Sequence, residues 1–282
     1  MNKLFQPVQV GSLTLKNSIV FAPTSVGQEG LNFYEKIAKG GASLIILPDI
    51  SVIPSMLGAP SLGSLQYADY FRKVVEICHR YDCKVSVQLF HPEYDVDYIG
   101  SLYRQRGKIS SDEVHHLLAE NMMGYADTLT TEQADAIVEK FAAAARNARE
   151  VGVDMIQIHG DRLIGSFSSA LFNHRTDRYA PHTAFAEAVV KAVRAAVPEM
   201  PLDYKMTIRT EEPKLGRGGA LISEVPEFVE VLEAAGVDAF HVAIANHSNI
   251  RDTIPAANHP LLQGEGCFTH LGRAVLTMAR KP

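Results

Sequence analysis

The sequence has 282 residues, of which 46% are hydrophobic and 21% are charged, and its formal net charge is -5. This composition supports a full-sized core and argues against intrinsic disorder. The net negative charge shows no excess of basic residues of the kind that binds nucleic acid, so we expect no nucleic-acid partner. No apolar run approaches the roughly 18 residues of a membrane span, so we expect no membrane partner. The first ten residues contain no apolar stretch typical of a signal peptide, which predicts a cytoplasmic protein.

Cysteine and histidine spacing gives little sign of a metal centre. The three cysteines form no C-x-x-C pair, so neither a disulfide framework nor a zinc ribbon is indicated. His115–His116 and the pair His241 and His247 raise a metal hypothesis. The first predicted strand lacks the H-x-H that barrel hydrolases usually carry there. We therefore predict no metal site.

A repeated helix–glycine–strand unit is the most informative pattern. It occurs at Ile37–Asp49, Ala148–Gly160 and Leu232–Ile244. In each copy a helical stretch ends at glycine, which supplies a left-handed C-cap, and a short apolar strand follows at once. Regular alternation of helices with buried strands is typical of parallel βαβ units.

Extending this pattern outward predicts six strands and five helices. The strands are expected at Ser18–Ala22, Ala42–Pro48, Lys84–Leu89, Met155–His159, Asp203–Thr207 and Ala239–Ala243. The helices are expected at Ala68–Tyr81, Glu132–Val151, Thr183–Val197, Glu224–Ala235 and Phe268–Arg280. Thr130 and Gln133 have the spacing of a capping box, and Ser223 is the expected cap of the fourth helix. The polar stretch 93–130 is expected to leave the sheet as an excursion.

These elements predict a TIM-type (β/α) barrel formed as a single domain over residues 1–282. A complete barrel has eight strands, and about six of the eight βα units are present here. A doubly wound open sheet is the alternative, although no G-x-G-x-x-G follows the first strand. An incomplete barrel leaves an open sheet edge, which a second copy or a partner chain would cover.

Five segments together resemble one enzyme family. They are LFQPVQVGSLTLKNSIVFAPTS (4–25), VQLFH (87–91), IQIHG (156–160), NHRTDRY (173–179) and the GG…LEAAGVD…HV stretch (218–242). In order and approximate spacing they are similar to the old yellow enzyme family of NADH:flavin oxidoreductases. The resemblance implies an FMN lying across the C-terminal mouth of the barrel. NADH or NADPH would reduce this flavin, which would then pass hydride to a small α,β-unsaturated carbonyl compound.

The same resemblance implies which residues would hold the flavin. Pro23, Thr24 and Ser25 match the segment that lines it. Gln88 matches the amide that pairs with the pyrimidine end of the isoalloxazine, although a buried amide bonded within the barrel is the alternative. Lys205 stands beside the flavin N1, where its cation would stabilise the anionic reduced form; a plain structural ion pair is the alternative.

The resemblance also implies the catalytic residues. His159 and Arg162 match the two donors that stabilise the negative charge on the substrate carbonyl oxygen. A histidine satisfied by backbone groups, and an arginine paired with an acid, are the alternatives. Phe90 matches a wall of the substrate pocket. Ile164 stands where the family has a proton-donating tyrosine.

Two departures define the alternative functions. Glu93 and Tyr94 replace the glycine and arginine that the family has after His91. The units that hold the FMN phosphate in the family are absent from this sequence, which predicts weak or partner-assisted FMN binding. The alternative function is therefore a non-catalytic or weakly flavin-binding truncated barrel that serves as a subunit or binding module. An incomplete product of a longer gene is a third hypothesis. The charged NHRTDRY segment is expected to be a loop held by Arg–Asp pairing.

Overall fold

A parallel sheet forms the centre of the computed structural model, which describes residues 3–24, 26, 30–54, 60–105, 108–211, 217–244, 266 and 269–280. Its strands in spatial order are β3 (Val20–Phe21), β4 (Leu44–Ser51), β5 (Lys84–Phe90), β6 (Met155–His159), β7 (Leu202–Arg209) and β9 (Ala239–Ile244). The short strand β8 (Ala220–Leu221) pairs with the end of β7. All six predicted strands are present, and every pairing in this sheet is parallel.

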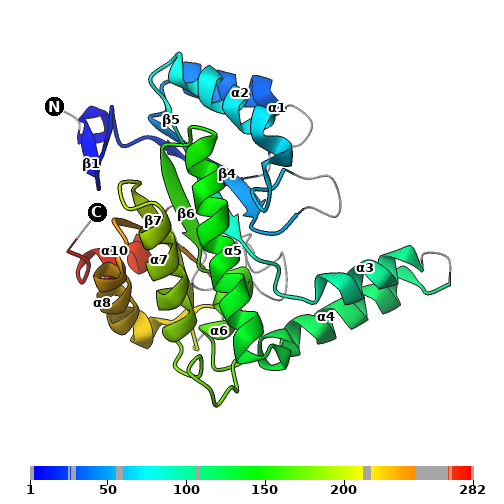
Figure 1. Ribbon diagram of the computed structural model, residues 1–282. Helices are drawn as coiled ribbons and strands as arrows, with labels where there is room; N and C mark the ends of the chain where they lie inside the picture. The colour runs from blue at the N-terminus through cyan, green and yellow to red at the C-terminus, as the bar shows by residue number, and fades with distance from the viewer. Residues whose placement is uncertain are drawn as a thin grey trace.

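The outer face of the sheet is apolar because alternate residues of a strand point to opposite faces. Val85, Val87, Ile156 and Tyr204 belong to one large core cluster with residues of the flanking helices. The helices on this face are α1 (Gly30–Lys39), α2 (Ala68–His79), α5 (Thr131–Glu150), α7 (Ala184–Ala196) and α8 (Val225–Ala235). Figure 1 shows α5 and α7 lying side by side over the sheet. This burial accounts for the apolar stripe of each helix.

The inner, concave face changes character along the strands. At the amino end, Leu44, Ile46 and Met155 form a small apolar cluster with Val10 and Leu15. The last two belong to an antiparallel hairpin of β1 (Val8–Val10) and β2 (Leu13–Leu15), which closes this end and which the sequence pattern did not predict. At the carboxyl end the inward positions are polar, so functional groups can gather there.

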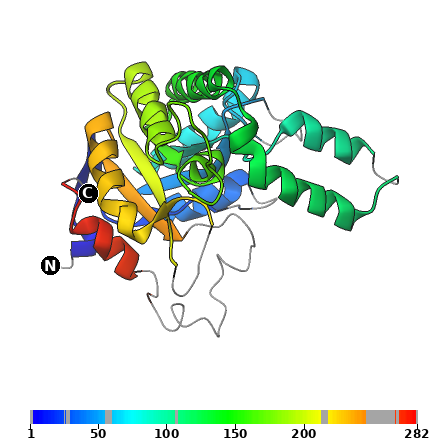
Figure 2. The same cartoon turned by 90° about the horizontal axis from the view of Figure 1, so that it is seen from below.

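Residues 93–130 form a helical arm. Helix α3 (Val96–Arg104) and helix α4 (Ser111–Thr128) project together away from the sheet, as Figures 1 and 2 show from two directions. Asp95 caps α3 by accepting from the N–H groups of Asp97 and Tyr98, and Ser110 caps α4.

Helix caps test two sequence predictions. The capping box of Thr130 and Gln133 is present at the start of α5, with both reciprocal hydrogen bonds. The prediction for Ser223 is wrong, because a 3-10 turn at Ile222–Glu224 precedes α8 and this helix has no side-chain cap. The last described helix, α10 (Thr269–Leu276), packs beside α8 and β9.

These elements make an incomplete α/β barrel, as predicted. The six parallel strands, with helices on the outer face, form a half-barrel. Among the described strands, β9 pairs only with β7, so its second side carries no described neighbour.

Candidate functional site

The strand registers bring the predicted residues to the carboxyl end of the sheet. Gln88 of β5 lies level with Gln157 of β6, and His159 lies level with Lys205 of β7. Pro23 follows β3 and is half-buried, and Thr24 beside it is exposed. Ser25 lies outside the described residues. We call this carboxyl end of the concave face the mouth.

Two residues at the mouth have left-handed backbone conformations. Asp49 has φ 47° and lies at an irregularity in the pairing of β4 with β5, and Arg162 has φ 56° at the start of α6 (Arg162–Phe167). Such a conformation costs a non-glycine residue about 1–2 kcal/mol and occurs preferentially at functional sites. The two residues also contact each other, since Arg162 Nη2 lies 3.2 Å from Asp49 Oδ2. Both members of this ion pair therefore have a backbone conformation that is unfavourable for a non-glycine residue.

Arg162 is held between two carboxylates. Its Nη1 donates to Glu93 Oε1 at 3.2 Å, and Glu93 is almost completely buried. Burial by itself would lower the pKa of Arg162, but Glu93, Asp49 and Asp161 raise it above its ordinary value. The guanidinium also lies over the Phe90 ring, 5.9 Å from its centroid. The side chain stays 38% exposed, so a fixed cation faces the mouth.

His159 ends β6 directly beside this pair. Its Nε2 lies 3.6 Å from Asp49 Oδ1, and its Nδ1 accepts from the N–H of Asp161 at 3.3 Å. The next residue, Gly160, donates its N–H to Lys205 O, and a Cβ on it would lie 2.4 Å from that same oxygen. Only glycine fits there, because a side chain would collide with the backbone of β7.

Lys205 presents a half-buried cation on the same face. Among the described residues its ammonium group has no ion pair within 4.0 Å. Burial lowers the pKa of Lys205, and the carboxylates of Asp161 and Asp49 partly oppose this. A structural ion pair was the alternative to a flavin contact for Lys205, and no such pair is present among the described residues.

Deeper in the concave face, amide side chains form a hydrogen-bonded row. Gln88 Nε2 donates to Gln157 Oε1 at 2.5 Å, and Gln157 Nε2 donates to Asp203 Oδ2. Gln157 is completely buried, and Gln88 is 2% exposed. Gln88 is thus bonded within the barrel and also reaches the mouth, where its Oε1 accepts from the N–H of Asp49 at 3.4 Å.

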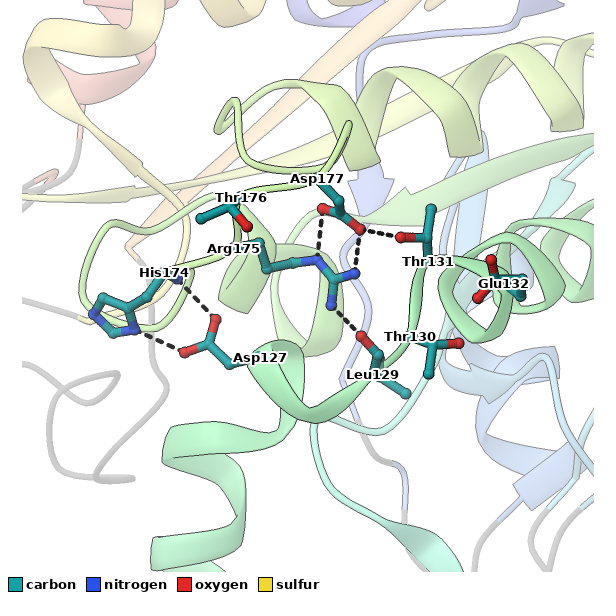
Figure 3. Close-up of a pocket in the computed structure, with 9 residues that line it drawn as sticks. All are labelled: Asp127, Leu129, Thr130, Thr131, Glu132, His174, Arg175, Thr176 and Asp177. Carbon is teal, nitrogen blue, oxygen red and sulfur yellow. Dashed lines mark hydrogen bonds and ion pairs between the residues drawn. The ribbon is translucent and has the colours of Figure 1, made fainter.

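The charged segment 173–179 belongs to the connection between β6 and α7 and is a loop held by Arg–Asp pairing, as predicted. Figure 3 shows Arg175 paired with Asp177, while the Arg175 Nη1 donates to the Leu129 carbonyl at the junction of α4 and α5. His174 pairs with Asp127 at 2.7 Å. These residues line a pocket of about 440 Å³ on the outside of the half-barrel. They fasten the base of the helical arm to the loop.

Within the described ranges, no group of three or more His, Cys, Asp or Glu side chains is placed to hold a metal ion. His115 and His116 are both exposed on α4, and His247 lies outside the described residues. A search of the described helices finds none with the length and apolarity needed to cross a bilayer.

The family follows from a comparison with known proteins. The model of the NADH:flavin oxidoreductase / NADH oxidase family matches residues 3–268, which is nearly the whole chain. The chain belongs to this family. The membership confirms the predicted oxidoreductase class and the cofactor pair of FMN with NADH or NADPH.

Two curated family members are similar over most of this chain. A bilirubin reductase of Clostridium symbiosum is 40% identical over 277 residues, which are 94% of this chain and 74% of that protein. A bilirubin reductase of Mediterraneibacter gnavus is 39% identical over 90% of this chain, although the match spans only 41% of that protein. This chain is therefore about two fifths as long as some of its relatives.

Solved structures support the fold. 2-Naphthoyl-CoA reductase in complex with 2-naphthoyl-CoA aligns with 99% of this chain and 46% of its own, with a TM-score of 0.75 and 18% identity. The old yellow enzyme TcOYE aligns over 82% of its own length with a TM-score of 0.69. At 18% identity these likenesses concern the fold alone.

The residues of the mouth fit a flavin by their chemistry. An amide such as Gln88 offers a donor and an acceptor side by side, as the pyrimidine edge of a flavin requires. Lys205 offers a half-buried ammonium, which suits the negative charge of a reduced flavin. If the family's cofactor binds here, Gln88 and Lys205 are the residues that would hold its ring.

Sequence reasoning missed Asp49 and Glu93 as members of this site. Asp49 directly follows a predicted strand end, and barrel sites collect at such ends, so its position was a usable signal. Glu93 was recognised only as a departure from the family. Its role depends on Arg162, whose partner lies 69 residues away in the sequence.

Proposed function

We propose that this chain is an FMN-dependent reductase of carbon–carbon double bonds conjugated to a carbonyl group. One observation carries the proposal: His159 and Arg162 meet around Asp49 at the mouth, beside Gln88 and Lys205. Two potential donors to a carbonyl oxygen thus stand next to residues that suit a flavin ring.

The chemistry requires a stabilised oxygen anion. When bound, FMN supplies hydride that it has taken from a reduced nicotinamide. As hydride reaches the β-carbon of the substrate, negative charge moves onto the carbonyl oxygen. His159 and Arg162 would donate hydrogen bonds to this oxygen, and donors placed in advance cost no reorganisation during the reaction. Asp49 would hold Arg162 in place through their ion pair.

The α-carbon must then receive a proton. Ile164 is 1% exposed and packs in the core, so its position contributes nothing to this step. The proton would come from water or another side chain at the mouth. We expect slow or poorly stereoselective protonation for this reason.

We further propose a bile pigment such as bilirubin as the substrate. The identities of 40% and 39% to two bilirubin reductases support this choice. A bile pigment carries conjugated lactam carbonyls and two propionate carboxylates. The permanently charged Arg162, 38% exposed, suits either a developing oxyanion or a substrate carboxylate.

Anaerobic turnover tests the proposal. The purified chain, supplied with FMN and NADH or NADPH, should absorb blue light and consume bilirubin with the oxidation of the nicotinamide. His159→Ala should reduce this rate about a hundredfold, the usual effect of losing an oxyanion donor. His116→Ala is a matched control, because His116 is exposed on the helical arm, where it pairs with Glu120.

The same preparation tests the alternative of a non-catalytic binding module. If the protein binds FMN but reduces neither bilirubin nor an enone, the enzymatic proposal is contradicted. Titration with FMN and riboflavin addresses the cofactor phosphate. We expect little preference for FMN, since the sequence pattern predicts weak binding of the FMN phosphate, and a strong preference would show that a phosphate site exists.

Three further properties of the protein are predictions that accompany the proposed function. They are a single domain over residues 1–282 with its excursion at 93–130, a second copy or partner chain on the open edge at β9, and a cytoplasmic location. Size-exclusion chromatography with light scattering would measure the oligomeric state.

A further inference from the structure

A continuous row of hydrogen bonds crosses four strands of the concave face. It begins at the Asp49 N–H on β4 and passes through the side-chain amides of Gln88 on β5 and Gln157 on β6. It ends at the carboxyl group of Asp203 on β7. Each amide accepts through its oxygen from one neighbour and donates through its nitrogen to the next.

The two ends of the row determine its direction. A backbone N–H can only donate, and an ionised carboxylate can only accept. The amino group of Gln157 must therefore face Asp203, which leaves its oxygen for Gln88. The amino group of Gln88 must then face Gln157, and its oxygen must face Asp49.

His241 on β9 supports the same direction. Its Nδ1 lies 3.1 Å from Gln157 Nε2. Burial, with a smaller contribution from Lys205, lowers the pKa of His241 to about 4, so the ring is neutral, and in the tautomer with its proton on Nε2 the Nδ1 accepts. The two N–H bonds of Gln157 thus serve Asp203 and His241, and a flipped Gln157 would lose both.

We propose that Gln157 and Asp203 are positioning residues that fix the orientation of the Gln88 amide for flavin binding. The inference rests on the proposed role of Gln88 at the pyrimidine edge of the flavin. A flipped amide exchanges its donor with its acceptor, whereas the donors and acceptors of the pyrimidine edge have a fixed order. A Gln88 without this constraint would therefore bind the ring less well.

The row has a titratable end. Burial raises the pKa of Asp203 to about 7, while the Gln157 amide and the Lys205 cation partly oppose the shift. The charged or titratable groups facing it are Lys205 on its own strand and His241 on β9, and β6 presents the neutral Gln157. A protonated Asp203 can donate as well as accept, so only His241 still requires the amino group of Gln157 on this side, and the constraint on Gln157 weakens. Flavin affinity should fall as the pH falls through about 7.

Flavin titration at several pH values tests the inference. Wild-type protein should bind FMN more tightly at pH 8 than at pH 6. Asp203→Asn should bind about tenfold more weakly at pH 8, comparable to the loss of one hydrogen bond, and should lack the pH-dependent step. Gln157→Met, which interrupts the row, should have the same effect. Ser86→Ala is the matched control, since Ser86 is buried in the same sheet without a hydrogen bond from its hydroxyl.

Side-chain amide NMR of the flavin-free protein separates this inference from the proposed function. The Gln88 amide signal, assigned with Gln88→Ala, should shift with pH in the wild type and not in Asp203→Asn. If the wild type binds no FMN, the proposed function fails. The NMR signals alone then test whether the hydrogen-bonded row fixes the Gln88 amide. Equal FMN affinity and pH dependence in wild type and Asp203→Asn, or a Gln88 signal insensitive to pH in both, would overturn the inference.

Discussion

Two arginine–aspartate pairs in this protein differ in burial and in backbone conformation. Arg175 is 6% exposed, and its guanidinium donates to Asp177 and to the carbonyls of Ala126 and Leu129. Arg162 is 38% exposed, and both it and its partner Asp49 have left-handed backbone conformations. The first pair closes a junction between helices. The second holds a cation at the mouth under strain.

The comparison shows that an ion pair alone does not indicate function. A structural pair satisfies its donors with backbone acceptors and an ordinary backbone. We expect a functional pair to keep exposed surface and to retain strain that only the surrounding fold maintains. Four measurements test this distinction between a structural and a functional ion pair.

The largest effect is expected at Arg175. Arg175→Ala should lower the free energy of unfolding by about 3–5 kcal/mol, because Asp177 and two carbonyls lose a buried partner. Urea denaturation measures this change. Arg178→Ala is the control, since Arg178 is 60% exposed and a solvent-exposed pair such as the one with Asp135 contributes little to stability. Equal costs for the two variants would contradict a structural role specific to Arg175.

The next effect concerns catalysis at Arg162. Arg162→Ala should slow the reoxidation of reduced flavin by an enone about a hundredfold or more, equivalent to roughly 3–4 kcal/mol in the transition state. Reduction of the flavin by nicotinamide should change less. Stopped-flow measurement of the two half-reactions separates these steps, with Arg178→Ala as the control. An unchanged oxidative rate would remove Arg162 from the chemistry.

A smaller effect should reveal the strain. Arg162→Gly should be about 1 kcal/mol more stable than Arg162→Ala, because glycine adopts φ 56° without steric cost. Arg175 is not among the residues with positive φ, so Arg175→Gly should be less stable than Arg175→Ala. Thermal or urea unfolding of the four variants measures both differences. The same sign at both positions would contradict strain at Arg162.

The smallest effect is a difference in acid stability. The hydrogen bond from Arg175 holds the pKa of Asp177 below its ordinary value. A carboxyl with a depressed pKa in the folded state stabilises the protein fully above its unfolded pKa, near 3.9, and this contribution is lost as the pH falls below that value. Asp177→Asn should therefore be less stable than wild type at pH 7, with a difference that shrinks below about pH 4. Unfolding curves from pH 7 to pH 3 measure it.

Much of the fold could be predicted from local patterns. Strand β6 has the predicted bounds, and β5 and β9 each extend one residue further. The glycine that ends each helical stretch marked where the strands begin, as at Gly236 with φ 119°. The hairpin β1–β2 was missed because two strands of three residues carry too little periodicity to be recognised.

The site was predicted only in part, for a related reason. The amino-acid sequence by itself determined the βα repeat, the family and the residue types at the strand ends, because hydrophobic periodicity and motif spacing are local properties. Only the tertiary structure decided that Asp49 bridges His159 and Arg162, and that Glu93 pairs with Arg162. Each of these contacts joins residues at least 69 positions apart. Such contacts depend on parallel strands ending at a common edge, which no local pattern records.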